Sequence, residues 1–244
     1  MDRLIYTALT GMQRAEERQQ VTANNLANAQ TPGFRREMAA LATGWLQPGG
    51  AALSSRVQSG GEAPHDLLET GRVETTGNTL DIALDGGAWL AVGDQAGEPA
   101  LTRRGDLRLD AQGQLLTGDG RPVLGEDGPI RIAIGNAAVR IDRTGEVQTK
   151  PTIDGAWVPV ARLRLVSPDP ATLNRGADGL FRSPDMDADP LATVTTGALE
   201  RSNVQPTTSL IELIEQSRAF EVQTKLLSAA REMDEGTAAL MRVE

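Results

Sequence analysis

The chain has 244 residues, a formal net charge of −9 and no cysteine. The negative charge argues against nucleic-acid binding, because phosphate contacts need clustered Lys and Arg. The lack of cysteine excludes disulfides, thiolate metal sites and cysteine nucleophiles. The single histidine, His65, lies in a glycine- and proline-bearing stretch where a solvated side chain is expected. No apolar run approaches the roughly 20 residues of a membrane span, and the start of the chain lacks the features of a secretory signal, so composition alone indicates a cytoplasmic protein.

The first segment, residues 1–41, opens with a pattern that predicts a helix from Asp2 to about Ala29. Apolar and small residues recur at alternating steps of three and four, which is the spacing of a coiled-coil seam. Two of the seven seam positions are polar, so the stripe needs a partner to be stable. Pro32 and Gly33 then end the helix, because proline cannot continue it. The seam positions are Ile5, Ala8, Met12, Ala15, Gln19, Thr22 and Leu26.

The middle of the chain changes to short alternating patterns. Residues 42–76, rich in Gly, Ser and Ala at their start, indicate an extended or irregular linker. Residues 77–200 predict a central antiparallel β domain of the sandwich or barrel kind, because strand-like alternation is interrupted by turn clusters such as 110–113 and 142–145. The strand-like stretches are 80–84, 107–109, 130–134, 139–141 and 163–165.

The last segment, residues 201–244, predicts a second helix from about Pro206 to Val243. With both ends helical, the expected fold is α+β, with the terminal helices pairing as a coiled-coil-like layer beside the β domain. Two interpretations stay open: the helices pack within one ordinary domain, or they are exposed surfaces of a self-assembling subunit. The main stripe is Ala219, Val222, Leu226, Ala229, Met233, Gly236, Leu240 and Val243, and Leu210, Leu213, Ile214, Ser217 and Phe220 lie on a slightly rotated face upstream.

Two motifs at opposite ends of the chain resemble one protein family. The run Ala-Asn-Asn-Leu-Ala-Asn-Ala-Gln-Thr-Pro-Gly-Phe-Arg at 23–35 is similar to the N-terminal signature of the flagellar rod and hook axial proteins. The segment 202–225, with Ser-Asn-Val at its start, resembles their second signature, and stretches 77–86 and 101–105 resemble their β domain. Within the family, the opening residues and the length look most like the proximal rod type. The distal rod and the hook are the alternatives.

The resemblance implies a structural subunit of the basal-body rod, without enzymatic activity, cofactor, metal, nucleic acid or small-molecule substrate. Its terminal helices would pair and stack with neighbouring subunits. It would reach the periplasmic rod through the flagellar type III export apparatus, which needs no cleaved signal. The implied assembly interface comprises Ile5, Ala8, Met12, Ala15, Gln19, Thr22, Asn24, Asn25, Leu26, Asn28, Thr31, Gly33, Phe34, Ser202, Asn203, Val204, Leu210, Ile214, Phe220, Val222, Leu226, Ala229, Met233 and Leu240.

Several signature residues have a direct physical use. The amides of Asn24, Asn25 and Asn28 can bridge neighbouring helices or backbone, which fixes register. Gly33 is expected to adopt a backbone conformation that other residues avoid, and Phe34 to anchor the turn into the following segment.

Two other classes of protein were weighed. An enzyme would need paired carboxylates, for which Asp81 with Asp85 and the alternating acidic residues at 185–189 are the candidates. The first pair flanks a turn, where Asp is expected for backbone hydrogen bonding. The alternation at 185–189 also suggests a Ca²⁺ site, but it lacks the glycine and terminal glutamate of an EF-hand loop. A carbohydrate-binding module or adhesin would need exposed aromatic side chains, and aromatics make up 3% of the chain.

Overall fold

A computed structural model describes residues 2–38, 44–45, 57–58, 65–66, 68–133, 135, 138–152 and 155–241. These residues form an α+β fold with a β-rich centre, as predicted. The chain divides into two compact units. The helical unit comprises Met1–Ala29, Arg36–Leu67 and Val204–Glu244, and the β unit comprises Gln30–Arg35 and Leu68–Asn203. The short segment 30–35 therefore belongs to the β unit although both of its flanks belong to the helical unit.

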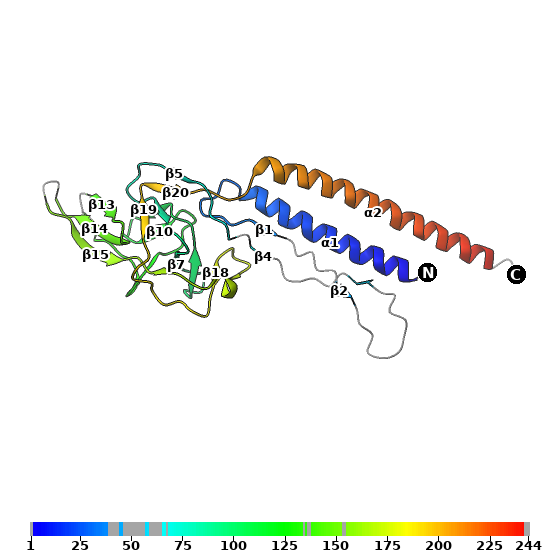
Figure 1. The fold of residues 1–244 in the computed structure, drawn as a ribbon, viewed down its shortest axis with the longest axis horizontal. Coiled ribbons are helices and arrows are strands. Elements are labelled where there is room, and N and C mark those ends of the chain that lie inside the picture. Colours follow the sequence, from blue (N-terminus) through cyan, green and yellow to red (C-terminus); the bar gives the residue numbers. More distant parts are fainter. Residues whose placement is uncertain are drawn as a thin grey trace. The chain divides into compact units, whose positions relative to one another are not determined.

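The described elements follow one another in a simple order, with one helix near each end of the chain and short strands between them (Figure 1). In chain order they are α1 Asp2–Ala27, β1 Glu37–Met38, β2 Gly44–Trp45, β3 Val57–Gln58, β4 His65–Asp66, β5 Val73–Thr75, β6 Ile82–Leu84, β7 Trp89–Gly93, β8 Pro99–Thr102, β9 Leu107–Leu109, β10 Leu115–Thr117, β11 Leu124–Gly125, β12 Gly128–Pro129, β13 Ala138–Ile141, β14 Glu146–Lys150, β15 Val158–Arg162, β16 Leu165–Val166, the 3₁₀ turn η1 Pro170–Thr172, β17 Asn174–Arg175, β18 Phe181–Arg182, β19 Val194–Thr196, β20 Ala198–Glu200 and α2 Pro206–Met241.

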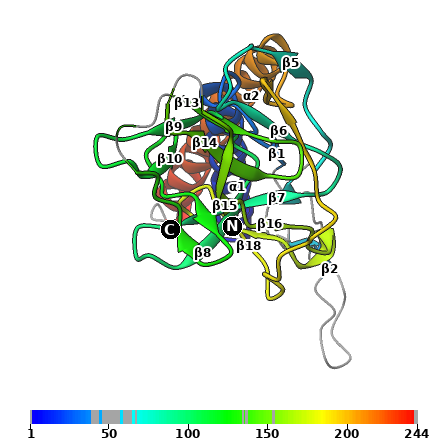
Figure 2. The same ribbon diagram turned by 90° about the vertical axis from the view of Figure 1, so that its left-hand side faces the viewer.

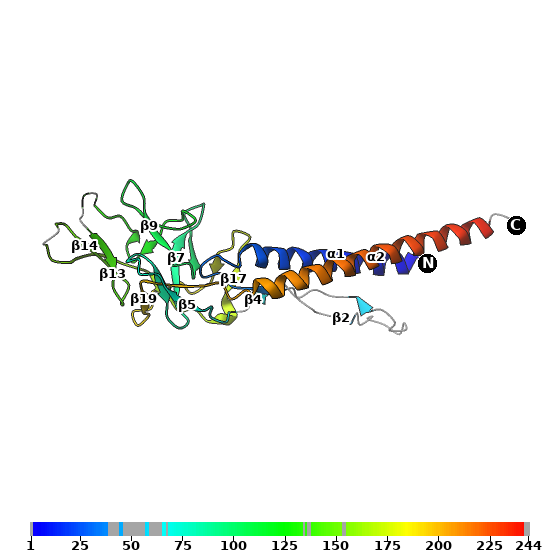
Figure 3. The same ribbon diagram turned by 90° about the horizontal axis from the view of Figure 1, so that it is seen from above.

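In the helical unit, α1 and α2 lie side by side, as Figures 1 and 3 both show. Their facing sides are partly polar: the Gln216 amide donates a 2.9 Å hydrogen bond to the buried Thr22 hydroxyl. Arg36 forms a two-pronged ion pair with Glu212, with N–O distances of 2.9 and 3.0 Å. β1 pairs with β4 and β2 with β3, both antiparallel. Within the described residues, no helix has the length and hydropathy needed to cross a lipid bilayer.

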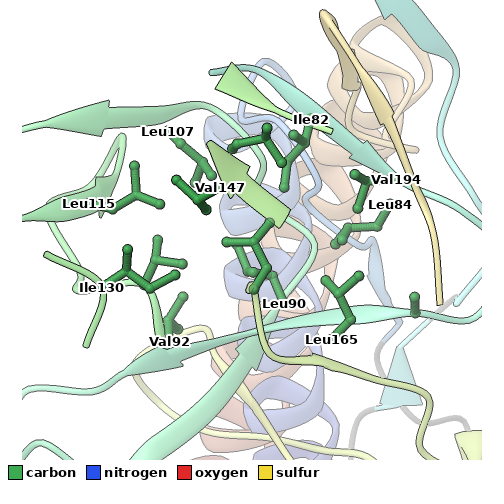
Figure 4. Packing of buried hydrophobic residues seen from close by; sticks show 14 of the residues in the cluster. Ile82, Leu84, Leu90, Val92, Leu107, Leu115, Ile130, Val147, Leu165 and Val194 are labelled. Carbon is green, nitrogen blue, oxygen red and sulfur yellow. The ribbon is translucent and has the colours of Figure 1, made fainter. Parts of the chain in front are cut away.

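The β unit is built from small antiparallel sheets (Figure 2). The largest sheet has five strands in the order β16-β7-β8-β18-β17. β13, β14 and β15 form a second, three-stranded sheet. Leu90, Val92, Leu115, Val147 and Val194 are almost completely buried in the main hydrophobic cluster, to which most of these strands contribute (Figure 4).

Strand β7 carries both cores of the β unit. Its sequence, Trp-Leu-Ala-Val-Gly, is continuously apolar, and all five residues are buried. Since side chains alternate across a strand, Leu90 and Val92 enter the main cluster while Trp89 and Ala91 enter a smaller one on the other face. There the Trp89 and Phe181 rings pack with their centroids 4.7 Å apart. A central strand covered on both faces explains why its sequence does not alternate between apolar and polar residues.

The predicted turns at 110–113 and 142–145 are confirmed. In each turn the aspartate carboxylate accepts hydrogen bonds from the backbone N–H groups two and four residues later, at 2.7–3.0 Å. The glycine that closes each turn has a φ of +77°, a conformation that costs glycine little. The same arrangement recurs at Asp94, which the sequence analysis did not predict.

The prediction of a strand over 130–134 is wrong for the described part of that stretch. Ile130 and Ile132 are buried in the main cluster, but their backbone N–H groups donate to two different segments, at Val123 and Gly113. Arg131 between them makes a single bridge to Gln114. The apolar–polar alternation therefore indicates only that one face of an extended segment is buried. A buried face does not require the segment to pair continuously with a neighbouring strand. Ile134 lies outside the described residues.

Candidate functional site

The β unit contains a buried cluster of charged side chains formed by Arg35, Arg103 and Glu200, called here the arginine–glutamate cluster. Glu200 ends strand β20, and its carboxylate accepts hydrogen bonds from both arginines. The Arg103 Nε and Nη2 atoms lie 2.9 and 2.6 Å from the Glu200 Oε2 atom, and the Gly71 N–H lies 2.8 Å from Oε1. The side chains of Arg35 and Glu200 are each 1% exposed.

Arg103 ties this carboxylate to the sheet. Its guanidinium donates to the backbone carbonyls of Leu84, Gly86 and Ala88 at 2.7–2.9 Å, besides its bonds to Glu200. A buried guanidinium needs acceptors for its five donors. Arg103 finds them in the loop between β6 and β7, so Glu200 is fixed to that loop through Arg103.

The signature segment 30–35 reaches the same cluster by its backbone. The Gly33 N–H donates a 2.8 Å hydrogen bond to the Glu200 carbonyl oxygen. Gly33 has a φ of +69°, the left-handed conformation that was expected. A Cβ atom at this position would overlap the backbone carbonyl of Arg103. Glycine is therefore required twice here, by its backbone angle and by the close approach of another chain segment.

Phe34 and Arg35 extend this attachment to the outer strands. Arg175 in β17 donates a 2.6 Å hydrogen bond to the Arg35 carbonyl oxygen. Its guanidinium also lies 4.9 Å from the ring centroids of both Phe34 and Phe181, a distance at which a cation is attracted to an aromatic face. The Asn203 N–H donates to the Phe34 carbonyl oxygen at 3.3 Å. Both signatures thus meet in one unit, although about 170 residues separate them along the chain.

Burial dominates the electrostatics of Arg35. Desolvation lowers the pKa of the Arg35 guanidinium, the charge of Arg103 lowers it further, and the Glu200 carboxylate raises it in part. Two cations face one anion in this cluster. A buried ion pair gives little net stability but is costly to break, because the remaining charge stays buried. The cluster therefore holds the segment 30–35 and strand β20 together within the β unit.

In the helical unit, the side chain of Asn25 links helix α1 to strand β1. Its side-chain amide is buried and bonds to Glu37 twice: Nδ2 donates to the Glu37 carbonyl at 2.7 Å, and the Glu37 N–H donates to Oδ1 at 2.9 Å. The amide thus pairs with strand β1 as a neighbouring strand would, while Glu37 pairs with Asp66 of β4 in the sheet register. Asn28 is used locally instead, donating to the Asn24 carbonyl and side chain at 3.0 Å.

Replacing Asn25 with alanine is expected to release strand β1. The substitution removes both hydrogen bonds and leaves the Glu37 backbone groups without these partners, which costs about 1–3 kcal/mol for a buried polar group. Hydrogen exchange of the Glu37 amide is the measurement, and protection should fall about tenfold or more, as about 1.4 kcal/mol requires. The exposed neighbour Asn24→Ala is the control. Equal protection in both variants would contradict this role for Asn25.

The structure positions the remaining interface residues in different environments. On α1, Thr22 is buried and Met12, Ala15, Gln19 and Leu26 are partly buried. In the β unit, Thr31, Ser202 and Asn203 are partly buried, and Val204 at the start of the helical segment is buried. Phe220 of α2 is partly buried. The side chains of Ile5, Ala8, Met233 and Leu240 lie outside the described ones.

The outward side of α2 carries part of the predicted stripe and part of the rotated face upstream of it. Val222 and Leu226 are 56% and 63% exposed, and Leu210 and Ile214 are 50% and 47% exposed. Ala229 is exposed as well. The partly buried side of α2 contains Leu213, Gln216 and Phe220 instead. The apolar stripe therefore faces away from the intramolecular contact with α1.

The carboxylates that were candidates for catalysis accept structural hydrogen bonds, either within a turn or from another segment. Asp81 accepts from the Thr76 hydroxyl at 2.7 Å and the Asn78 amide at 2.9 Å. Asp85 accepts from the hydroxyls of Thr193 and Thr195, both at 2.9 Å. In the 185–189 stretch, Ser167 donates to the Asp189 carboxylate at 2.7 Å and lowers its pKa. Among the described residues, no group of His, Asp and Glu side chains is arranged to hold a metal ion.

Comparisons with known proteins match most of the chain. Residues 5–35 match the family model described as "Flagella basal body rod protein", residues 83–149 "Flagellar hook protein FlgE/F/G D1 domain", and residues 195–240 "Flagellar basal body rod FlgEFG protein C-terminal". The flagellar basal-body rod protein FlgF of Escherichia coli K12 is 37% identical, over 94% of this chain and 94% of that protein. FlgF of Salmonella typhimurium LT2 is 35% identical over 98% and 97%. FlgG of Agrobacterium fabrum is 27% identical over 95% and 96%.

These matches and the two linked signatures define an axial structural protein of the bacterial flagellum. The chain belongs to the flagellar basal-body rod protein family and is of the FlgF type. It is a structural rod subunit of the basal body, and the prediction of that family is confirmed.

Arg103 and Glu200 were not predicted as site residues from the sequence. One signal was available for Glu200: in Ala-Leu-Glu at 198–200, Ala198 and Glu200 share one face of the strand, and both are buried. A charged residue on an inward face needs a partner of opposite charge. The sequence does not identify that partner, because Arg35 and Arg103 are 165 and 97 positions away.

Proposed function

We propose that the subunit assembles into the rod through its terminal helices, with the outward stripe of α2 as the principal contact. The observation that supports this proposal is the exposure of Leu210, Ile214, Val222 and Leu226 along one helix. Single exposed apolar residues are normal, but several large ones on the outward half of one helix are typical of an interaction surface. Full burial of each such side chain contributes about 1.5–3 kcal/mol, which is enough to drive stacking of many identical subunits.

The finer features follow from the same proposal. The terminal helices pair and stack as a coiled-coil-like layer, and the interface comprises the residues given for it above. The four segments 1–41, 42–76, 77–200 and 201–244 act as axial helix, linker, β domain and second axial helix. The subunit occupies the proximal part of the periplasmic rod, arrives through the flagellar type III export apparatus, and works without catalysis. The higher identity to FlgF proteins than to FlgG proteins supports the proximal position over the distal one.

The α2 stripe can be tested with two matched double variants. Val222→Glu with Leu226→Glu places two charges on the stripe. Thr224→Glu with Ser228→Glu places the same two charges on exposed polar positions of the same helix, on the opposite side from Val222 and Leu226. The stripe variant should abolish swimming and leave rods truncated in electron micrographs of purified basal bodies, because an interface cannot bury unpaired carboxylates.

The monomers of both double variants should be as stable as the wild type within about 0.5 kcal/mol, since all four positions are exposed. The control variant should swim. Normal rods in the stripe variant would show that α2 does not use this face in assembly.

A further inference from the structure

The β unit contains a cavity of about 170 Å³ beside the arginine–glutamate cluster. Arg35 and Arg103 line it together with the apolar side chains of Trp89, Pro168, Pro170 and Leu173. Its volume is well above the roughly 15 Å³ that a single water requires. A cationic base with an apolar rim is a suitable environment for an acidic side chain entering from outside, because the rim excludes water and strengthens the charge interaction.

The donors of Arg35 are not all used. Its Nη1 atom pairs with Glu200, but its buried Nε atom has no hydrogen-bond partner among the residues that the structure describes. The guanidinium of Arg103, in contrast, is bonded through Nε, Nη1 and Nη2. A guanidinium presents its Nε and Nη donors in a fork that matches the two oxygens of a carboxylate. Arg35 therefore has the chemistry to accept a second carboxylate.

The excess positive charge of the cluster also favours binding of a second carboxylate. Within the described residues the cluster contains two guanidinium groups and one carboxylate, and Glu200 is the ion-pair partner of both arginines. A buried excess charge is unfavourable unless an opposite charge compensates it. Burial lowers the pKa of Arg35, Glu200 raises it in part, and the charge of Arg103 lowers it further.

We propose that this cavity receives the carboxylate of an Asp or Glu side chain from a neighbouring rod subunit, which binds Arg35. A protein side chain fits better than a free anion because the rim is largely apolar and would be covered by a chain segment. Acidic side chains are abundant if the neighbour is a second copy, since the chain has 33 acidic residues against 24 basic ones. The contact would link assembly to the segment that carries the N-terminal signature.

Gly87 offers a way to test the cavity without altering the cluster. It lines the cavity, and a Cβ atom added there would meet nothing within 4 Å. Gly87→Glu supplies a carboxylate from within the chain, Gly87→Gln supplies the same shape without charge, and Gly87→Ala leaves the cavity open. Thermal melting of the purified full-length proteins should place Gly87→Glu several degrees above Gly87→Gln. Sodium propionate, compared with sodium chloride at equal ionic strength, should raise the Tm of the wild type and Gly87→Ala saturably and leave Gly87→Glu unchanged.

Swimming and rod length distinguish the source of the carboxylate. Gly87→Glu and Gly87→Gln should both impair rod assembly, because each fills the cavity that the neighbour needs, whereas Gly87→Ala should assemble normally. Equal Tm values for Gly87→Glu and Gly87→Gln, or equal propionate effects in all variants, would overturn the carboxylate site. Normal rods with Gly87→Gln would overturn the assignment to a neighbouring subunit and leave a free anion as the ligand. Failure of Gly87→Ala would show that the glycine itself is needed, and would also overturn the proposal.

Discussion

Replacing Glu200 with glutamine is expected to destabilise the β unit by about 3–5 kcal/mol, the usual cost of breaking a buried ion pair. The substitution keeps the shape of the side chain but removes the charge that compensates Arg35 and Arg103. Both guanidinium groups would then remain buried, with exposed fractions of about 1–3%. Urea denaturation is the measurement, and the midpoint should fall while the m-value stays unchanged.

A surface ion pair in the same unit is the matched control. Arg201 and Glu74 are 2.8 Å apart, and their side chains are 49% and 43% exposed. Glu74→Gln should cost no more than about 1 kcal/mol, because exposed pairs are screened by solvent. If Glu200→Gln and Glu74→Gln shifted the midpoint equally, the cluster would not hold the segment 30–35 and strand β20 together.

Replacing Gly33 with alanine is expected to cost more than about 2 kcal/mol and to prevent rod assembly. The left-handed conformation alone costs a non-glycine residue about 1–2 kcal/mol, and Gly33 has a φ of +69°. In addition, the new methyl group would overlap the Arg103 carbonyl, which belongs to the backbone and cannot move aside as a flexible side chain could. The segment would be pushed off β20 and would lose its hydrogen bond to Glu200.

Gly77→Ala separates these two causes. Gly77 has a similar φ of +77°, but a Cβ atom there would meet nothing within 4 Å. Gly77→Ala should therefore show the conformational cost alone. Its loss of unfolding free energy should be smaller than that of Gly33→Ala by at least about 1 kcal/mol. Chemical denaturation gives both values, and rod length in purified basal bodies gives the effect on assembly. Equal destabilisation by the two substitutions would mean that the contact with Arg103 is unimportant.

Glu200→Gln and Gly33→Ala both test how the N-terminal signature acts. Gly33 and Phe34 are predicted from the sequence to belong to an assembly interface, and in the structure they make contacts within the chain. Gly33 fits against Arg103 and bonds to Glu200, and Asn25 holds β1. These intramolecular contacts do not exclude a role in assembly. They do mean that a loss of rods in a signature variant has to be compared with the stability of the monomer.

Much of the fold was determined by local sequence. The terminal helices were predicted from the three-four spacing of small and apolar residues, and they lie at Asp2–Ala27 and Pro206–Met241, within about two residues of expectation. The turns at 110–113 and 142–145 were predicted because Asp and Gly perform local chemistry there: the Asp carboxylate bonds to backbone two and four residues away. Such features depend on neighbours along the chain, which the sequence displays directly.

Tertiary structure alone decided which distant residues meet. The sequence presents Arg35, Arg103 and Glu200 as three separate charges, and their contact depends on how β20 and the segment 30–35 close onto the β unit. It also decided that Ile130 and Ile132 bond to different segments instead of forming a strand, and that the apolar stripe of α2 faces away from α1. The physical reason is the same in each case. Periodicity shows that one face of a segment is apolar, but the partner that covers this face is chosen by packing across the whole chain.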